Sequence, residues 1–184
     1  QGIVPITIWS YDEVGHTDES RKELKEIFSE SDSPFATPKP TRLMKRLLQL
    51  ASNEKNFLTL DSFAGSSSTA HAVLELNKED GGNRKFILVE QEDYANTITA
   101  ERVRRVIKGV KTAKSENLKK GTGGTFSYFQ LGDSIEMESI LTGKSLPSYE
   151  ELARYIFYTA TGQEFSSTKI NRKTNFIGET EHYE

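Results

Sequence analysis

Cysteine is absent from the 184-residue chain, which excludes disulfides, thiolate nucleophiles and cysteine-ligated zinc. The apolar runs are too short to cross a membrane, and the N-terminal residues lack the pattern of a signal peptide. The chain also lacks a large excess of either charge, and its net charge of −3 gives no overall attraction to nucleic acid. We therefore expect a cytoplasmic protein with no membrane partner.

Two common nucleotide-binding motifs are also missing. Gly65 is the only glycine in its loop, so the dinucleotide fingerprint G-x-G-x-x-G is absent. The segment "TGKS" at 142–145 lacks the upstream glycine of a phosphate-binding loop. We expect no metal site, because neither metal-ligand spacing nor a partner motif accompanies the three histidines, His16, His71 and His182.

The length and composition of the chain indicate one soluble domain with a single core. Apolar residues make up 35% of the chain and charged residues 28%. We assign residues 1–184 to this domain and expect 161–184 to form a polar, irregular tail. Residues 99–120 carry eight Lys or Arg against two Glu. Such a basic run favours a solvated helix face, with contact to phosphates or to a partner subunit as the alternative.

Apolar periodicity predicts helices alternating with strands. Helices are expected around 16–28, within 35–52 with Pro40 in the first turn, after the loop at 62–67, and over 97–110 and 148–157. Thr17 is the expected N-cap of the first helix, and Ser148 and Glu151 form a capping box for the last. Buried-strand patterns lie at 56–63, 85–91 and 126–131, and residues 2–9 form an extended segment. Buried strands that alternate with helices predict right-handed crossovers and a parallel sheet, the α/β class.

The most informative stretch is "FLTLDSFAGSSSTAHAVLELN", residues 57–77, in which a strand pattern ends in Asp61 and a loop of small residues. Glu90 ends the next strand pattern, and ligands of open parallel sheets bind outside the carboxyl ends of the strands. Small side chains let a ligand approach the backbone, and the following helix supplies amide donors. Alone, Asp61 could equally be a turn or helix-capping residue, and Glu90 an exposed strand-end charge. Together with the loop, they favour a nucleoside site in which Glu90 accepts hydrogen bonds from ribose hydroxyls.

Several segments together resemble one enzyme family. "DSFAGSSSTAHAV" resembles the D-x-F-x-G-S-G-T-T loop of the amino-group DNA methyltransferases that use S-adenosylmethionine. "FATPKPTRLMKRLL" is similar to their K-P motif, which precedes that loop in the permuted beta class. "KFILVEQEDYANTITAERVRRVIKGV" and "GTGGTFSYFQLGDS" are similar to the modification subunits of type III restriction systems. The resemblance extends from Trp9 to Phe157 and implies part of a Rossmann-like methyltransferase fold, with parallel strands and flanking helices.

The resemblance also implies roles for nine residues. The methionine part and the sugar of the cofactor would be cradled by Asp61, Phe63, Ala64, Gly65 and Ser66. The methionine end would be closed by Thr37, Lys39 and Pro40, and Glu90 would hold the ribose. Ser67 departs from the family, which usually has a second glycine there. If this position requires a positive φ, serine is strained by roughly 1 kcal/mol or more.

The catalytic tetrad of the family, [DNS]-P-P-[YFW], is missing, because none of the five prolines is adjacent to another. Methyl transfer to an adenine amine needs the acceptors and the stacking aromatic of that motif. We therefore expect the chain to be the C-terminal cofactor-binding part of a longer adenine-N6 methyltransferase, beginning after the tetrad and the target-recognition region and inactive alone. Its partners would be double-stranded DNA, a restriction subunit and a second copy of itself. Alternatives are part of a cytosine-N4 methyltransferase, or a non-catalytic binding or scaffold module with a decayed pocket.

Overall fold

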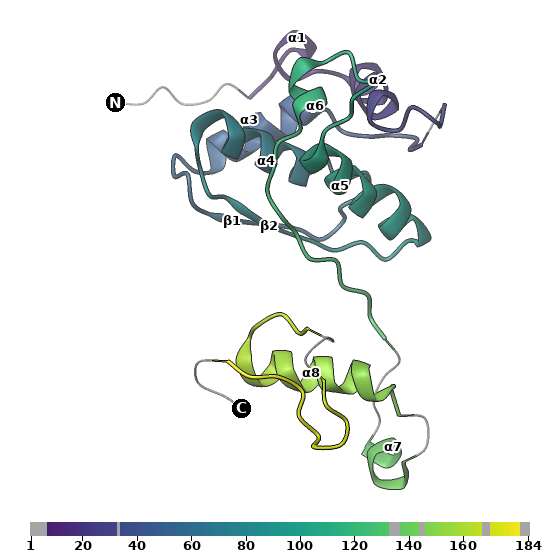
Figure 1. Cartoon of the computed structure of the whole chain (residues 1–184). Coiled ribbons are helices and arrows are strands. Elements are labelled where there is room, and N and C mark those ends of the chain that lie inside the picture. The colour runs from purple at the N-terminus through teal and green to yellow at the C-terminus, as the bar shows by residue number, and fades with distance from the viewer. Residues whose placement is uncertain (1–6, 33, 133–136, 144–145, 167–169, 181–184) are drawn as a thin grey trace. The chain divides into compact units, whose positions relative to one another are not determined.

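The computed structural model describes residues 7–32, 34–132, 137–143, 146–166 and 170–180 (Figure 1). Contacts divide the chain into two units, Gln1–Tyr128 and Phe129–Glu184, and each is described by itself. The first unit contains the sheet and most of the helices. The assignment of all 184 residues to one domain stays a prediction.

The sheet of the first unit has two strands, β1 (Leu58–Asp61) and β2 (Lys85–Leu88). They pair in parallel, with Leu58 opposite Lys85 and Asp61 opposite Leu88. Helix α4 (Ser68–Asp80) connects them. The predicted parallel pairing of these two strand segments is therefore confirmed, and this unit is of the α/β type.

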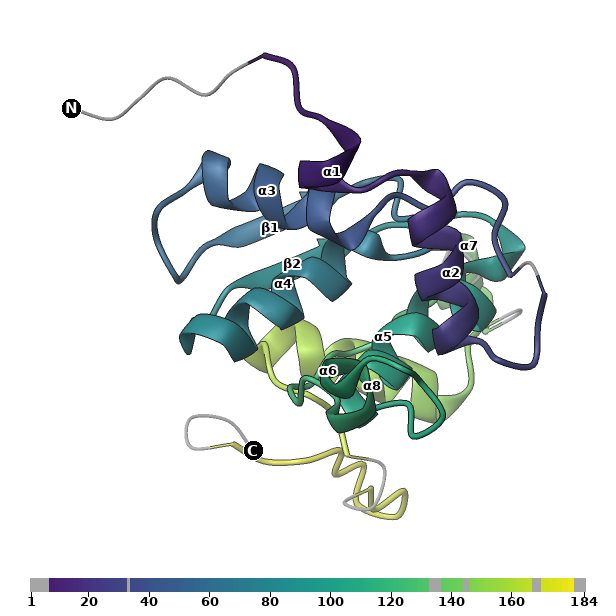
Figure 2. The ribbon, with the colours of Figure 1, turned by 90° about the horizontal axis from the view of Figure 1, so that it is seen from above.

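Helices cover one face of the two strands (Figure 1). Helix α4 is in the middle and contacts α3 (Thr41–Ala51), α5 (Glu101–Lys108) and β2. Helix α1 (Tyr11–Val14) contacts α3, and α2 (Thr17–Ile27) contacts α5 (Figure 2). Two short turns of helix, η1 (Asp93–Ala95) and η2 (Asn96–Ala100), lead into α5, and α6 (Glu116–Lys120) follows it.

The core lies between these helices and the inward face of the sheet. Leu24 and Ile27 of α2 meet Val103 and Val106 of α5 there, and each is buried. Burying a side chain of this size contributes about 1.5–3 kcal/mol. A second buried cluster joins α3 and α4 through Leu48, Ala72, Val73 and Leu76. Apolar residues of α2, α4 and α5 therefore form most of the core, whereas α3 buries Leu48 and leaves Leu47 and Leu50 exposed.

Helix ends differ from expectation by one residue at two places. His16, rather than Thr17, caps α2, because its Nδ1 accepts a hydrogen bond from the Glu19 amide at 3.2 Å. Helix α3 begins at Thr41 with Pro40 as its N-cap. The predicted helix over 97–110 is confirmed as η2 and α5, which ends before Gly109 at a φ of +90°.

The strand predicted at 126–131 is wrong, because these residues form no strand in the described part of the chain. The segment crosses the boundary between the two units, and no strand of the described residues pairs with it. Phe126 packs partly against the core, whereas Phe129 and Leu131 are exposed. Of the extended segment predicted at 2–9, residues 2–6 lie outside the described residues.

The second unit contains α7 (Met137–Thr142) and α8 (Tyr149–Thr161). The predicted capping box is confirmed: the Ser148 amide donates to Glu151 Oε2 at 2.8 Å, and the Glu151 amide donates to Ser148 Oγ at 3.3 Å. After α8, Asn171 and Phe176 form an isolated antiparallel bridge. Within the described ranges of both units, no helix has the length and apolar character needed to cross a bilayer.

Candidate functional site

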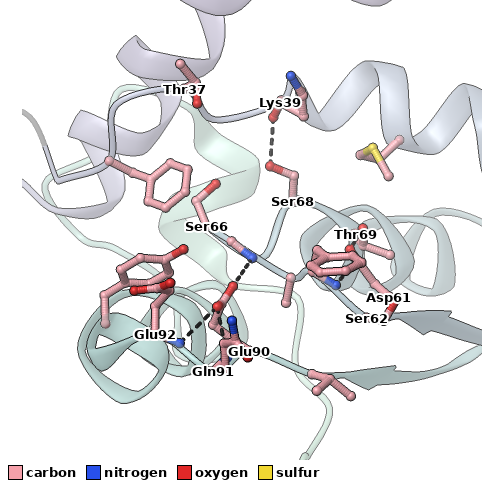
Figure 3. Close-up of a pocket in the computed structure, with 17 residues that line it drawn as sticks. Thr37, Lys39, Asp61, Ser62, Ser66, Ser68, Thr69, Glu90, Gln91 and Glu92 are labelled. Atoms are coloured by element: carbon pink, nitrogen blue, oxygen red, sulfur yellow. Dashed lines mark hydrogen bonds between the residues drawn. The ribbon is translucent and has the colours of Figure 1, made fainter.

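A cavity of about 560 Å³ lies at the carboxyl ends of β1 and β2 (Figure 3). Three segments line it: residues 35–44 before and within α3, residues 61–69 between β1 and the first turn of α4, and residues 89–94 after β2. These segments meet because parallel strands connected by a helix end at the same edge of the sheet.

Asp61 closes β1 and braces the loop that follows. Its Oδ1 accepts a hydrogen bond from the Phe63 amide at 3.2 Å, and its Oδ2 accepts one from Thr69 Oγ1 at 2.5 Å. Asp61 therefore makes the contacts expected of a turn or helix-capping residue. Its side chain also lines the cavity. Both functions use one carboxylate, because an ionised carboxylate has about four acceptor positions.

Glu90 follows β2 and contacts the same loop from the opposite side. Its Oε2 accepts a hydrogen bond from the Gly65 amide at 2.7 Å. Its Oε1 accepts from the amides of Gln91 and Glu92 at 2.9 and 3.1 Å. These three bonds fix the carboxylate at the cavity wall and leave acceptor capacity for a ligand (Figure 3).

The loop between Asp61 and α4 contains two residues in the left-handed region, Gly65 at a φ of +52° and Ser67 at +66°. A Cβ at Gly65 would lie 3.3 Å from Cζ of Phe35, so a side chain there would crowd the cavity wall. Ser67 is fully buried, and its hydroxyl has no hydrogen-bond partner among the described residues. The positive φ on which the expected strain depended is therefore present.

The wall opposite the loop is formed by residues 35–39 and Tyr94. Ser68 Oγ donates to the Lys39 carbonyl at 2.7 Å, which ties this wall to the start of α4. The rings of Phe35 and Tyr94 meet edge to face, with centroids 5.3 Å apart. Desolvation raises the pKa of Tyr94, and the charges of Glu90 and Glu92 raise it further, so its hydroxyl stays protonated at neutral pH.

Eight of the nine predicted cofactor residues line this one cavity: Thr37, Lys39, Asp61, Phe63, Ala64, Gly65, Ser66 and Glu90. Pro40 does not; it is buried, caps α3 and faces Gly15, where an added Cβ would lie 2.9 Å from the proline Cβ. Sequence reasoning assigned no role to several further lining residues, among them Phe35, Met44, Thr69 and Glu92. Thr69 lies in the same loop motif and could have been included, whereas no local pattern singles out Phe35.

His16, His71 and the basic run do not line this cavity. His71 is buried on α4 and His182 lies outside the described residues. Within the part of the chain that the structure describes, no cluster of three metal-ligating side chains occurs. The basic run divides: Lys108, Lys111, Lys114 and Lys120 are exposed, but Arg102 is fully buried.

The sequence of residues 1–101 matches a family of DNA methylases, and this match covers more than half of the chain. The chain therefore belongs to this family of DNA methylases. Over 90 residues it is 48% identical to the type III restriction-modification enzyme StyLTI Mod subunit of Salmonella typhimurium. The aligned residues cover 48% of this chain and 13% of that protein.

Two further relatives agree with this membership. The type III restriction-modification enzyme EcoPI Mod subunit of Escherichia phage P1 is 30% identical over 152 residues, covering 75% of this chain and 23% of that protein. The type II methyltransferase M.KpnI of Klebsiella pneumoniae is 38% identical over 84 residues, covering 46% of this chain and 19% of that protein. The chain thus spans less than a quarter of the length of each of these relatives.

Proposed function

We propose that this chain is the S-adenosylmethionine-binding portion of a site-specific DNA adenine-N6 methyltransferase of a type III restriction-modification system. The observation that carries the proposal is the cavity where Asp61 and Glu90 meet at the ends of two parallel strands. Similarity to two type III Mod subunits supports the system type. The fold proposed for the whole methyltransferase domain is Rossmann-like, with β1, α4 and β2 as one of its crossovers.

The residues present fit this cofactor in size and in chemistry. A volume of about 560 Å³ is within the usual range for small-molecule sites, about 300–1,000 Å³. Glu90 keeps about one acceptor position for a ribose hydroxyl, and the Phe35 and Tyr94 rings offer an apolar wall for the adenine. Asp61 supplies negative charge for the sulfonium end, and the exposed Lys39 supplies positive charge for the methionine carboxylate.

When bound, S-adenosylmethionine would supply the methyl group that is transferred to the target amine. The residues of this chain would bind and orient the cofactor, through Glu90 at the ribose and the loop of residues 61–68 at the methionine and sugar. Holding the adenine amine requires the D-P-P-Y-like tetrad, which this sequence lacks. We therefore propose that the chain is inactive alone, and that double-stranded DNA, a restriction subunit and a second Mod copy are partners of the full-length protein.

Calorimetry with S-adenosylmethionine tests this proposal. We expect binding in the micromolar range and a loss of about tenfold or more in Glu90→Ala, because at least one charged hydrogen bond of about 1.5 kcal/mol is removed. Glu54→Ala, which removes an exposed carboxylate outside the cavity, is the matched control and should bind as the unaltered chain does. No heat at millimolar ligand would instead support a scaffold module with a decayed pocket.

A further inference from the structure

Arg102 of α5 is the largest side chain that is completely buried in the described part of the chain. A buried guanidinium stays charged, although desolvation lowers the pKa of Arg102, so it needs hydrogen-bond acceptors around it. Its Nη1 lies 3.1 Å from the Ser66 carbonyl, 3.3 Å from Ser66 Oγ and 3.0 Å from Ser68 Oγ. Its Nη2 lies 3.0 Å from each of three atoms: Glu23 Oε2, Thr41 Oγ1 and His71 Nδ1.

These contacts place Arg102 between the two walls of the cavity without touching the cavity itself. Ser66 and Ser68 belong to the loop wall, and Thr41 begins α3 two residues after Lys39 of the opposite wall. The Ser68 hydroxyl extends the connection, because it accepts from Arg102 and donates to the Lys39 carbonyl at 2.7 Å. One guanidinium therefore sets the position of both walls relative to α5.

The protons of this cluster can be assigned from chemistry. Arginine only donates hydrogen bonds, so His71 Nδ1 must accept from Arg102 and the ring proton lies on Nε2. That nitrogen faces Glu75 Oε1 at 3.3 Å, and Glu75 in turn pairs with Lys45 at 3.3 Å. Glu23 balances Arg102 directly, at 3.0 Å. The network therefore connects the cavity loop, through Arg102, to Glu23 of α2 and, through His71, to Glu75 of α4.

Stability alone does not explain an arginine at this position. Its Nε is buried without a hydrogen-bond partner among the described residues, and desolvating a charge can outweigh the attraction that an ion pair gains. A packed apolar side chain would avoid both costs. What an apolar side chain would not provide is the set of donors that fixes the Ser66 carbonyl and the Ser68 hydroxyl.

We propose that Arg102 is a positioning residue for cofactor binding, which holds the loop of residues 66–68 against the wall of residues 37–41 in the geometry that accepts the ligand. This inference rests on the proposed function and names the residue, remote from the ligand, on which the shape of that site depends. It predicts that ligand affinity falls when Arg102 is changed, even though the side chain lines no part of the cavity.

Arg102→Lys tests the proposal, with Arg105→Lys as the matched control. Arg105 lies on the same helix and also makes several bonds, to the Ile27 carbonyl, Glu30 and Glu101, but none to the loop. Two readouts are measured on the chain: amide hydrogen exchange of residues 66–68 without ligand, and the Kd for S-adenosylmethionine. In Arg102→Lys we expect exchange about tenfold faster and a Kd about tenfold higher, as the loss of one charged hydrogen bond implies. In Arg105→Lys only the unfolding midpoint should fall.

The outcomes separate this inference from the proposed function. Unchanged loop exchange and an unchanged Kd in folded Arg102→Lys would overturn the role of Arg102 while the proposed function stands. No binding by the unaltered chain would remove the proposed function, and this inference with it. If Arg102→Lys does not fold, Glu23→Gln decides, because Glu23 contacts Arg102 and is remote from the cavity. Glu23→Gln should raise the Kd about threefold, because we expect roughly half the free-energy effect of losing a charged hydrogen bond. An unchanged Kd would refute the proposal.

Discussion

Replacing Ser67 with glycine should stabilise the chain, although it removes side-chain atoms from a fully buried position. Ser67 has a φ of +66°, where a non-glycine residue is strained by about 1–2 kcal/mol. Its buried hydroxyl has no partner among the described residues, a situation that costs about 1–3 kcal/mol. Glycine loses about 0.5–1 kcal/mol through backbone entropy, and the missing side-chain contacts cost about 0.8 kcal/mol per methylene equivalent. We expect a net gain of about 1–2 kcal/mol.

Thermal unfolding measures this gain, since 1 kcal/mol shifts the midpoint of a chain of this size by about 2–4 °C. Ser67→Ala separates the two contributions, because alanine removes the hydroxyl but keeps the strained φ. Its midpoint should therefore also exceed that of the unaltered chain. A lower midpoint for Ser67→Gly than for the unaltered chain would refute the reasoning.

Two further predictions concern Glu75 and Tyr94. Burial alone would raise the pKa of Glu75, but the hydrogen bond from His71 and the charge of Lys45 lower it to about 2. Its contribution of about 3 kcal/mol is therefore complete above pH 4.5 and is lost as the pH falls towards 2. Urea unfolding at pH 6 and pH 3 should show a smaller difference for Glu75→Gln than for the unaltered chain, and equal differences would contradict this. Tyr94→Ala should weaken S-adenosylmethionine binding about tenfold whereas Tyr94→Phe should not, because the ring supplies the apolar wall; equal affinities for the two variants would exclude that role.

Local patterns were sufficient to predict β1, β2 and the helix between them. The runs that end at Asp61 and Glu90 are short and apolar, and the helical spacing of Ala70, Val73 and Leu74 requires a crossover. Once the strands are parallel, topology brings their ends to one edge, so the shared cavity of the two acids could also be predicted.

The features that the sequence did not predict correctly depend on contacts between distant parts of the chain. The aromatic residues at 126–131 have strand propensity, but a strand forms only where a neighbouring strand offers hydrogen bonds, and no strand in the described ranges does so. Phe35 and Tyr94 come from distant parts of the sequence and meet in one wall of the cavity, and no spacing rule reports such a contact.

Arg102 shows the same limit most clearly. In the sequence it is one cation of a basic run, for which a solvated helix face is the better interpretation. Its burial depends on acceptors from the loop, α2, α3 and α4, which only the assembled fold brings together. Sequence patterns therefore locate the cavity, but they do not identify the residue that we propose shapes it.

We propose that the cavity lined by Asp61 and Glu90 binds S-adenosylmethionine. Amide chemical shifts of the ¹⁵N-labelled chain, followed during titration with the cofactor, test it most directly. We expect saturable shifts at Gly65, Ser66, Gln91 and Tyr94, with little change on the exposed lysine surface of α6. Shifts confined to α6 or to the second unit, or none at millimolar cofactor, would contradict it.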